Sequence, residues 1–379
     1  MTPTTELDEV IRRVATFGLD HVPARPSVAW STVNVDQLWS RAVSQRLTGL
    51  LVADVTAEGC AGMVPERVIE QLEPKMVERA LLLTTLEWHL VELVERLASD
   101  NIAVAAVKGP ALGRFLYPEH WWRDFGDLDL LVAATDLDAA ARTVESAGSR
   151  VIVAPPSRQA AALLGKGLTL RHDDGFEIDL HHTLISGGLG FGLGWDWWMA
   201  DPAEVELGGR PVVTTGTVRT ALHLLAHLCI GGSITSLHVA RDVAQILNSI
   251  DPTDQTGRQL IGAVLEAGLE GLVQTGLERT ETALSWHHEG WAAWSTDHPV
   301  PGNWHAVQRR FDREQDSFGA VVAASLRAHS RPTERMAVLR AVLWPDAAHL
   351  VDRGLTRQDY VGQVGRGLLG RGRGRGRGA

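Results

Sequence analysis

The fold is decided by the stretch Gly126-Asp127-Leu128-Asp129-Leu130-Leu131-Val132. Its short run of leucine and valine is typical of a buried strand, and side chains at positions i and i+2 of a strand point to the same face. Asp127 and Asp129 should therefore project together, with Leu128 and Leu130 turned toward the core. Two neighbouring carboxylates repel each other, so the pattern requires positive charge nearby, which a divalent cation can supply. Mg²⁺ is suitable because it prefers oxygen ligands and completes its shell with water and substrate phosphates.

A second acidic strand is predicted at Phe176-Glu177-Ile178-Asp179-Leu180, where Asp179 has apolar neighbours on both sides. Three carboxylates from neighbouring strands can hold two metal ions about 4 Å apart, which suits in-line attack at phosphorus. An Asp-x-Asp pair alone is also typical of turn chemistry at the start of a strand. The third acid and the Lys-Gly turn described next favour the metal site.

A strand-to-helix turn precedes these acids in the sequence. Residues 102–107 form a short apolar run that predicts a buried strand, and Lys108-Gly109-Pro110 ends it. Pro110 is well placed as the first residue of a short helix through about Tyr117. Such a turn directs helix N-terminal amides and an ammonium group at an anion such as a triphosphate. Only three lysines occur in the chain, so the position of Lys108 at this turn makes it a site candidate.

Alternating strands and helices around these motifs predict a small α/β unit. Further strands are expected at 150–153, 168–172 and 176–182, the last two joined by a hairpin turn at Asp173-Asp174-Gly175, and a helix capped by Thr135 is expected over 135–147. Helical spacing predicts helices before residue 100 and again over 218–230, 236–250, 257–277, 305–328 and 333–343. The tryptophan-rich segment 284–304 is expected to be a packed, irregular connection.

These patterns together predict an α+β protein in four parts. A small mixed-sheet core at 101–215 is flanked by an N-terminal helical region at 1–100 and a C-terminal helical region at 216–360. The Gly-Arg repeat at 361–379 cannot bury a core and is predicted to be a disordered tail.

Charge and composition limit the kinds of molecule that the protein is expected to bind and the compartment in which it is expected to lie. The chain has 379 residues and a net charge of −10, but the last 19 residues hold five arginines and no acid, so the other 360 carry 31 basic and 46 acidic residues. An acidic body makes nucleic acid an improbable partner, although the arginine-rich tail could contact RNA. No apolar run is long enough for a membrane span, no signal peptide is evident, and only two cysteines occur, so a cytoplasmic location is expected.

Three segments together resemble a known family. They are Val107-Lys-Gly-Pro-Ala-Leu112, Arg123-Asp-Phe-Gly-Asp-Leu-Asp-Leu-Leu-Val132 and Glu177-Ile-Asp-Leu-His-His182. Over roughly residues 75–250 the chain resembles the uncharacterised bacterial nucleotidyltransferases of the DNA polymerase β-like superfamily. The resemblance implies a polymerase β-like core and Mg²⁺-dependent transfer of a nucleoside monophosphate from an NTP to an acceptor hydroxyl. ATP is the first candidate for the NTP. The acceptor would be a small molecule, a peptide or a protein, and pyrophosphate would be released.

The resemblance also implies residue roles. Asp127 and Asp129 would bind both metal ions, Mg²⁺ or Mn²⁺, while Asp179 would complete the metal site on the nucleophile side and help deprotonate the acceptor. The nucleotide would be bound by Lys108, Gly109, Arg123 and Gly126. The wider superfamily has Gly-Ser or Gly-Gly where this chain and its family have Lys-Gly, so details of phosphate binding should differ.

Several histidines are secondary candidates. His181 should share the face of Asp179 and could contact a metal-bound carboxylate. His223 and His227 have the i, i+4 spacing of metal ligands, which would suit a zinc hydrolase, but no glutamate follows His223 and ordinary helix packing is favoured. In the resembled family this helical region lies beside the nucleotide, so His227 or Asp242 could touch substrate. Lys166-Gly167 lacks the rest of a phosphate-loop pattern, and we assign it no role.

An alternative class is a catalytically inactive nucleotidyltransferase fold that serves as a binding or scaffolding protein. Three clustered acids argue against it, because a retired site does not need them.

Overall fold

The structure is a computed structural model. It describes residues 3–24, 28–60, 62–153, 165–185, 189, 192–230, 236–300, 302, 304–305, 308, 322, 326, 332–344, 350 and 354–368.

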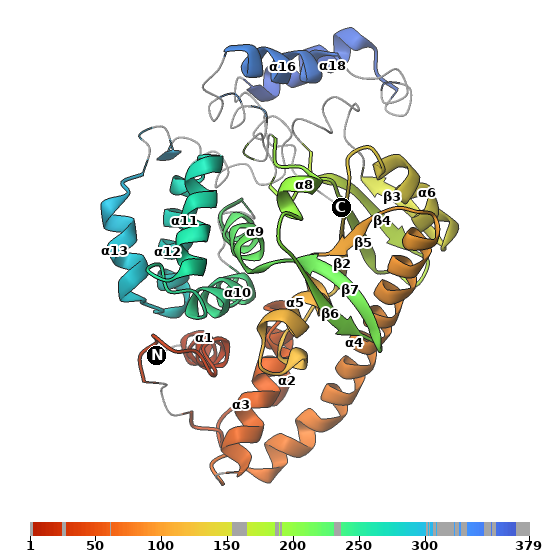
Figure 1. The fold of residues 1–379 in the computed structure, drawn as a ribbon. Helices are drawn as coiled ribbons and strands as arrows, with labels where there is room; N and C mark the ends of the chain where they lie inside the picture. The colour runs from red at the N-terminus through yellow and green to blue at the C-terminus, as the bar shows by residue number, and fades with distance from the viewer. Residues whose placement is uncertain are drawn as a thin grey trace.

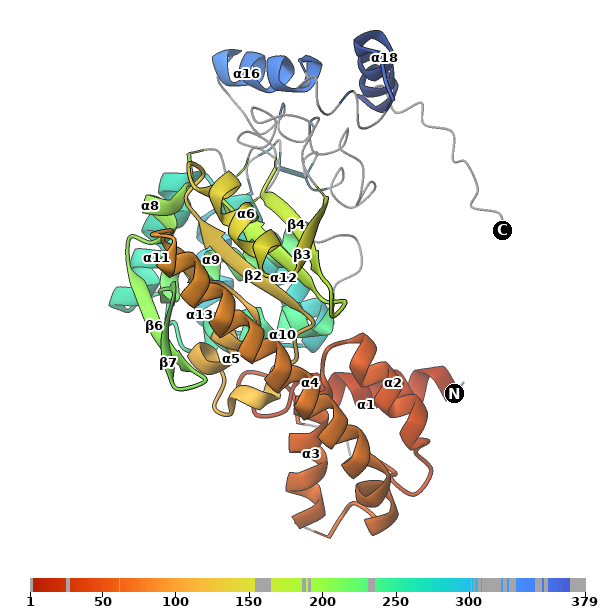
Figure 2. The ribbon, with the colours of Figure 1, turned by 90° about the vertical axis from the view of Figure 1, so that its right-hand side faces the viewer.

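The N-terminal part is helical. It contains α1 (Pro3–Ala15), α2 (Val35–Ser44), α3 (Thr48–Cys60) and the long α4 (Glu66–Ser99). In Figures 1 and 2, α1 to α3 gather around the first half of α4, and the second half of α4 continues along the sheet. The helical structure predicted before residue 100 is confirmed, and the leucines of α4 at 86, 90, 93 and 97 are buried along one face. The helix ends where Asn101 adopts a left-handed conformation with φ 59°.

The central sheet has five strands in the order β1-β2-β5-β4-β3. The strands are β1 (Val104–Ala106), β2 (Asp127–Val132), β3 (Ser149–Val153), β4 (Gly167–His172) and β5 (Glu177–His181). Strands β2 and β5 are parallel and the other neighbouring pairs are antiparallel. The predicted small mixed sheet of an α+β protein is therefore confirmed, as is the β4–β5 hairpin, whose turn places Gly175 at φ +96°.

Short helices join these strands. Helix α5 (Gly109–Leu116) follows β1, the 3-10 turn η1 (His120–Trp122) precedes β2, and α6 (Leu137–Ser146) joins β2 to β3. The predicted cap at Thr135 is wrong: Asp136 is the N-cap residue of α6, and it makes no side-chain capping hydrogen bond. The N-cap thus lies one residue later than predicted.

A two-stranded hairpin, absent from the sequence predictions, follows the short helix α8 (Trp195–Trp198). Strand β6 (Pro202–Leu207) pairs with β7 (Arg210–Thr215) around Gly208 and Gly209, which both have positive φ. Two such residues form the tight turn that glycine favours.

The C-terminal helices are α9 (Thr217–Ile230), α10 (Leu237–Asn248), α11 (Gln255–Ala267), α12 (Glu270–Leu284) and α13 (Glu289–Asp297). The single helix expected over 257–277 is wrong, because Gly268 takes φ 65° and separates α11 from α12. The connection expected over 284–304 contains α13, whose His288 side chain caps Trp291.

Two more helices lie near the C-terminus. Helix α16 (Pro332–Leu343) confirms the one predicted at 333–343, whereas most of 305–328 lies outside the described residues. Helix α18 (Arg357–Leu368) extends into the segment predicted to be disordered. The backbone N–H of Asp359 donates to Thr356 Oγ1 at 3.2 Å and Tyr360 is buried, so a capping contact and an apolar anchor stabilise this helix. The rest of the tail, 369–379, lies outside the described residues.

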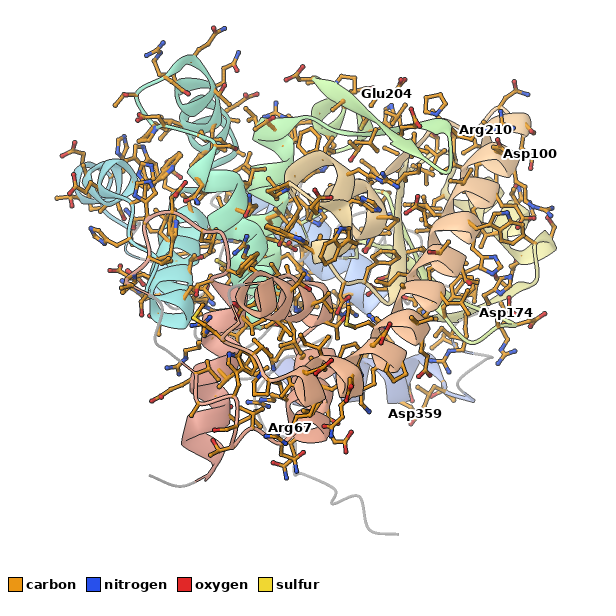
Figure 3. All side chains as sticks on the ribbon, turned by 90° about the horizontal axis from the view of Figure 1, so that it is seen from below. Arg67, Asp100, Asp174, Glu204, Arg210 and Asp359 are labelled. Atoms are coloured by element: carbon orange, nitrogen blue, oxygen red, sulfur yellow. The ribbon has the colours of Figure 1, made fainter. Side chains whose placement is uncertain are left out.

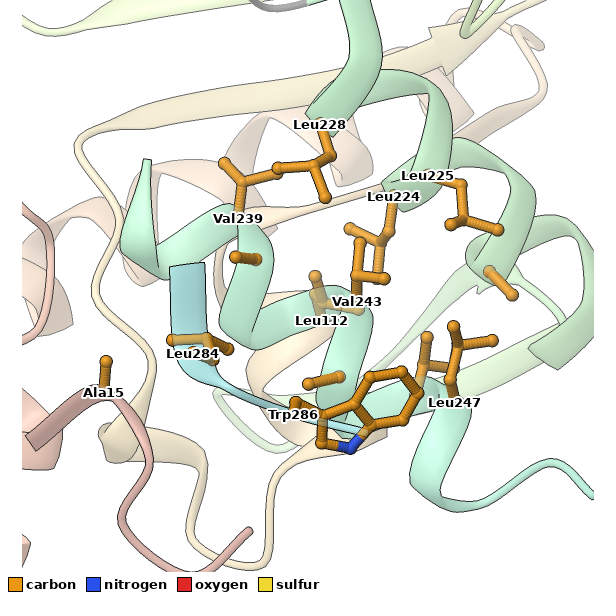
Figure 4. Close-up of a cluster of buried hydrophobic side chains, with 14 of the residues drawn as sticks. Ala15, Leu112, Leu224, Leu225, Leu228, Val239, Val243, Leu247, Leu284 and Trp286 are labelled. Carbon is orange, nitrogen blue, oxygen red and sulfur yellow. The ribbon is translucent and has the colours of Figure 1, made fainter. Parts of the chain in front are cut away.

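The buried side chains form two main clusters. One lies between α4, α6 and one face of the sheet. The other joins the N-terminal helices to α5, α9, α10 and α12. In Figure 4, Leu112 of α5 packs among Leu224 of α9, Val243 of α10 and their neighbours. This packing fixes α10 against the turn that begins α5.

Among the described helices, none combines the length and apolar character that a membrane span requires.

Candidate active site

The three predicted carboxylates lie on one face of the sheet. Because β2 and β5 are parallel and in register, Asp129 lies directly opposite Asp179, and Asp127 lies opposite Glu177. The intervening Leu128 and Leu130 are fully buried on the other face. The alternation predicted from the sequence is confirmed.

Asp129 is the most enclosed of these acids. Lys108 Nζ donates to its Oδ1 at 2.7 Å, and His181 Nε2 lies 2.9 Å from the same oxygen. Burial by itself would raise the pKa of Asp129, but the Lys108 charge and the His181 hydrogen bond hold that pKa well below its usual range. Asp129 is therefore ionised, and the positive charge that the sequence pattern requires comes here from the protein. His181, predicted to share the face of Asp179 and to contact a metal-bound carboxylate, is hydrogen-bonded to Asp129.

Asp127 is paired with an arginine that the sequence analysis did not single out. Arg46 Nη1 donates to Asp127 Oδ1 at 2.9 Å, and Nη2 lies 3.4 Å from Oδ2. Arg46 has φ 51° and lies just before α3, eighty-one residues away in sequence. No local pattern distinguishes it from the many other arginines, so only the packing of α3 against the site reveals it.

The donor set fits a divalent cation. Ligand atoms of Asp129, Asp179 and His181 all lie within 4.8 Å of one another. Asp179 also accepts a hydrogen bond from Thr169 Oγ1 at 2.6 Å, which orients its carboxylate. Carboxylate oxygens from adjacent strands match the ligands that Mg²⁺ prefers. The carboxylate of Asp127 stands outside this group while Arg46 holds it.

The Lys108–Gly109 turn has the form predicted. Gly109 adopts φ +52°, a left-handed conformation that strains residues with a Cβ, and Pro110 lies in the first turn of α5. The side chain of Lys108 returns to Asp129. The turn therefore places an ammonium group and the N-terminal amides of α5 beside the carboxylates.

Arg123 is buried and already engaged. Its Nε and Nη2 donate to the carboxylate of Asp242 at 2.9 to 3.2 Å, while Nη1 donates to the Gly109 carbonyl at 3.1 Å. Asp242 also accepts a hydrogen bond from Tyr117 Oη at 2.6 Å. Burial and the Asp242 charge raise the pKa of Tyr117 well above its usual value, so the phenol remains a donor. This pair ties α10 to the Gly109 turn.

A buried acid anchors the loop before β2. Asp124 accepts hydrogen bonds from the backbone N–H and the hydroxyl of Thr48, both at 2.8 Å, and thereby caps α3. Arg79 Nη2 donates to the Phe125 carbonyl at 2.9 Å. Gly126, the next residue, has room for a side chain, since a Cβ there would meet only Arg46 Nη2 at 3.9 Å. The structure thus gives no steric reason for glycine at this predicted nucleotide-binding position.

A cleft of about 230 Å³ opens at these residues. It brings together Lys108, Gly109, Arg123, Asp127, Asp129 and His227 of the predicted site, and it adds Arg46, Leu228, Ser236, His238 and Val239. Gly126, Asp179, His181 and Asp242 are outside its lining. The cleft is rich in cationic side chains, which suits a phosphate-bearing ligand.

The histidines of α9 are neutral. Burial first, and then the charges of Lys108 and Lys166, lower the pKa of both His223 and His227 well below the usual value. His223 packs near Trp198, with ring centroids 6.2 Å apart. In the described part of the chain, neither histidine belongs to a group of three ligand atoms, so the packing interpretation is supported and the zinc hydrolase is not.

Lys166 was given no role from the sequence. Burial, together with the charge of Lys108, lowers its pKa to about 8, and both Asp129 and Asp179 oppose this shift. It therefore belongs to the electrostatic surroundings of the carboxylates. A lone Lys-Gly pair carried no signal of this, because only the pairing of β4 with β5 brings Lys166 there.

The sequence matches the family described as uncharacterised nucleotidyltransferase over residues 31–284. The chain belongs to this family, which confirms the predicted resemblance to uncharacterised nucleotidyltransferases. It is a nucleotidyl-transfer enzyme by class.

Similarity to solved structures is distant. The antibiotic-resistance factor ANT(2'')-Ia shares 14% identity at a TM-score of 0.28, with 57% of this chain and 97% of that chain covered. An antigenic nucleotidyltransferase-like protein from Paracoccidioides brasiliensis shares 16% identity at a TM-score of 0.32, with 54% and 92% covered. No curated protein matches the sequence.

Proposed function

We propose that this protein transfers a nucleoside monophosphate from an NTP, with ATP as the first candidate, to an acceptor hydroxyl and releases pyrophosphate. The observation that carries the proposal is Asp129 lying opposite Asp179 on parallel strands, beside the Lys108 turn, in a chain of the nucleotidyltransferase family. The acidic body favours a small molecule, a peptide or a protein as acceptor.

Asp127, Asp129 and Asp179 are the proposed ligands of the metal. Two Mg²⁺ ions, or Mn²⁺, would there supply positive charge to the phosphates and align the acceptor oxygen with the α-phosphorus. The carboxylate oxygens of the three residues support this assignment, and His181 holds Asp129 in place.

Arg46 and Lys108 are the proposed phosphate contacts. Both line the cleft, and both now bind carboxylates, so each can exchange its carboxylate partner for a phosphate oxygen. The guanidinium of Arg123 is held by Asp242 and by the Gly109 carbonyl, so its role is to position the turn. Gly109 lets the backbone approach the triphosphate.

In the reaction, Asp179 accepts the proton of the acceptor hydroxyl. The acceptor oxygen then bonds to the α-phosphorus, and the bond from that phosphorus to the oxygen bridging to the β-phosphate breaks. The leaving pyrophosphate takes the electron pair of that bond, and Lys108 with the amides of α5 stabilises its charge.

The test has two arms. First, ATP, GTP, CTP and UTP, each labelled at the α-phosphate, are incubated with the protein, Mg²⁺ and a cell extract, and the labelled product is identified. Second, thermal unfolding is followed with ATP and Mg²⁺. We expect stabilisation that EDTA abolishes and that Asp129→Asn and Asp179→Asn lose.

The exposed Asp20→Asn is the matched control and should retain both label transfer and stabilisation. If no nucleotide stabilises the protein and the two site variants behave like the control, the chain is the inactive binding module and the proposal is wrong.

The reducing cytoplasm, expected from the two cysteines, is the compartment in which we propose that the reaction occurs.

A further inference from the structure

A second cluster of metal-ligand side chains lies on the other face of the sheet. His89 comes from α4, His172 ends β4, and Asp174 lies in the β4–β5 turn. On β4, His172 shares the face of buried Leu170, whereas Thr169, which binds Asp179, points to the opposite face. Figure 3 shows Asp174 at the edge of the molecule beside the β4–β5 hairpin. The cluster is therefore separate from the carboxylate site.

The three side chains converge on one point. Asp174 Oδ2 lies 3.3 Å from His89 Nε2 and 3.3 Å from His172 Nδ1. One ligand atom from each residue lies within 4.8 Å of the others. The two imidazole rings are 4.8 Å apart between centroids, and Phe176 stacks on His172 at 4.6 Å. Side chains from a helix, a strand and a turn are thus held ready around a common centre.

The other ring nitrogen of each histidine faces an oxygen acceptor. His172 Nε2 lies 3.1 Å from the Ala147 carbonyl, which can only accept, so Nε2 carries the proton and Nδ1 has the lone pair. His89 Nε2 points at Asp174 Oδ2, 3.3 Å away, while its Nδ1 lies 4.0 Å from Glu92 Oε2 on the same helix. Histidines that bind metals are oriented in this way by carbonyls and carboxylates.

We propose that His89, His172 and Asp174 form a binding site for one divalent transition-metal ion, with Zn²⁺ the best match. Two imidazole nitrogens and one carboxylate suit Zn²⁺, whereas Mg²⁺ prefers oxygen ligands. Asp174 is 65% exposed in its side chain, so water can complete the coordination. The backbone N–H of Asp174 donates to His172 Nδ1 at 3.1 Å. When the ion binds to Nδ1, this N–H would instead donate to water, since the hairpin is exposed.

The ion would join α4 to the β4–β5 hairpin. Since β5 carries Asp179, this clip would hold the strand that supplies one carboxylate of the proposed active site. The proposal does not depend on the nucleotidyl-transfer reaction, because its readouts are metal binding and thermal stability.

The experiment is equilibrium dialysis of the full-length, metal-stripped protein against Zn²⁺. We expect His172→Gln and His89→Gln to lose one bound Zn²⁺ and Asp174→Asn to bind it at least tenfold more weakly. Asp174 is exposed, so its variant keeps the test valid if a histidine variant fails to fold.

Two variants serve as controls. His181→Gln alters the carboxylate cluster, and His288→Gln alters another histidine pair, His21 and His288, whose ring centroids lie 4.5 Å apart. Both should keep the Zn²⁺ that His172→Gln loses, and Zn²⁺ should raise the melting temperature of both by more than that of His172→Gln. Unchanged stoichiometry and affinity in His89→Gln and Asp174→Asn, or loss of this ion only in His181→Gln, would overturn the proposal.

Discussion

Replacing Asp242 tests how the active-site turn is held. Arg123 and Asp242 are 7% and 2% exposed in their side chains and share hydrogen bonds of 2.9 to 3.2 Å. Asp242→Asn keeps the shape of the side chain but leaves the guanidinium buried without its counter-charge. Breaking a buried pair in this way costs about 3–5 kcal/mol of unfolding free energy. An exposed pair of similar length gives a matched reference, since Asp8 and Arg41 lie 3.0 Å apart at 42% and 45% exposure.

Urea denaturation measures the difference. Asp242→Asn should lower the midpoint by an amount equal to that free energy divided by an unchanged m value. Asp8→Asn should cost less than about 1 kcal/mol, because an exposed pair contributes little. In the double variant Arg123→Met/Asp242→Asn no charge is left buried, so its cost should be about 2–3 kcal/mol below the sum of the single costs. A cost for Asp242→Asn as small as that of Asp8→Asn, or strict additivity, would refute the reasoning.

Three further predictions concern the same cleft. Asp129→Asn and Asp179→Asn should each lower the rate of label transfer from an NTP at least about 100-fold, since charge stabilisation of this kind contributes that much; rates near wild type would exclude both as metal ligands. Gly109→Ala should cost about 1–2 kcal/mol of unfolding free energy, because φ is +52° there. Gly262→Ala is the control and should be stabilising, because Gly262 lies inside α11 with open space around its Cβ position. Equal effects of the two substitutions in urea melts would contradict this prediction. Burial lowers the pKa of His238 to about 4, so the unfolded chain binds more protons than the folded chain between pH 4 and 6.5. The stability of the protein should therefore fall as the pH drops through this window. In thermal melts across pH 4 to 7, the stability of His238→Gln should fall less steeply than that of the wild type.

Much of the site could be read from local patterns. The alternation of Asp127 and Asp129 with leucines, and the Lys108–Gly109 turn before a proline, each express backbone geometry over a few residues. Such geometry depends on neighbours in the sequence, so the strand faces, the strand-to-helix turn and the hairpin turn could all be predicted. The break at Gly268 was missed because helical spacing continues across it, and a single glycine is also tolerated within a helix.

Contacts between distant segments could not be predicted in this way. Arg46 reaches Asp127 across 81 positions, and Arg123 reaches Asp242 across 119. Arginine is common in this chain, so its presence at these positions carried no signal. Arg123 was expected at the phosphates, and only the packing of α10 on α5 and α9 shows that its guanidinium is held by Asp242.

The sequence by itself determined the mixed-sheet α+β class and the carboxylate strands, because period-two patterning and turn chemistry are local properties. Its three motifs also resembled the nucleotidyltransferase family. The tertiary structure alone decided which cations face those carboxylates. It also decided that Lys166 interacts electrostatically with those carboxylates and that His89 of α4 lies next to Asp174 of the hairpin, beside His172. These facts depend on how buried apolar faces bring separate elements together, and burial then determines how strongly each charge acts.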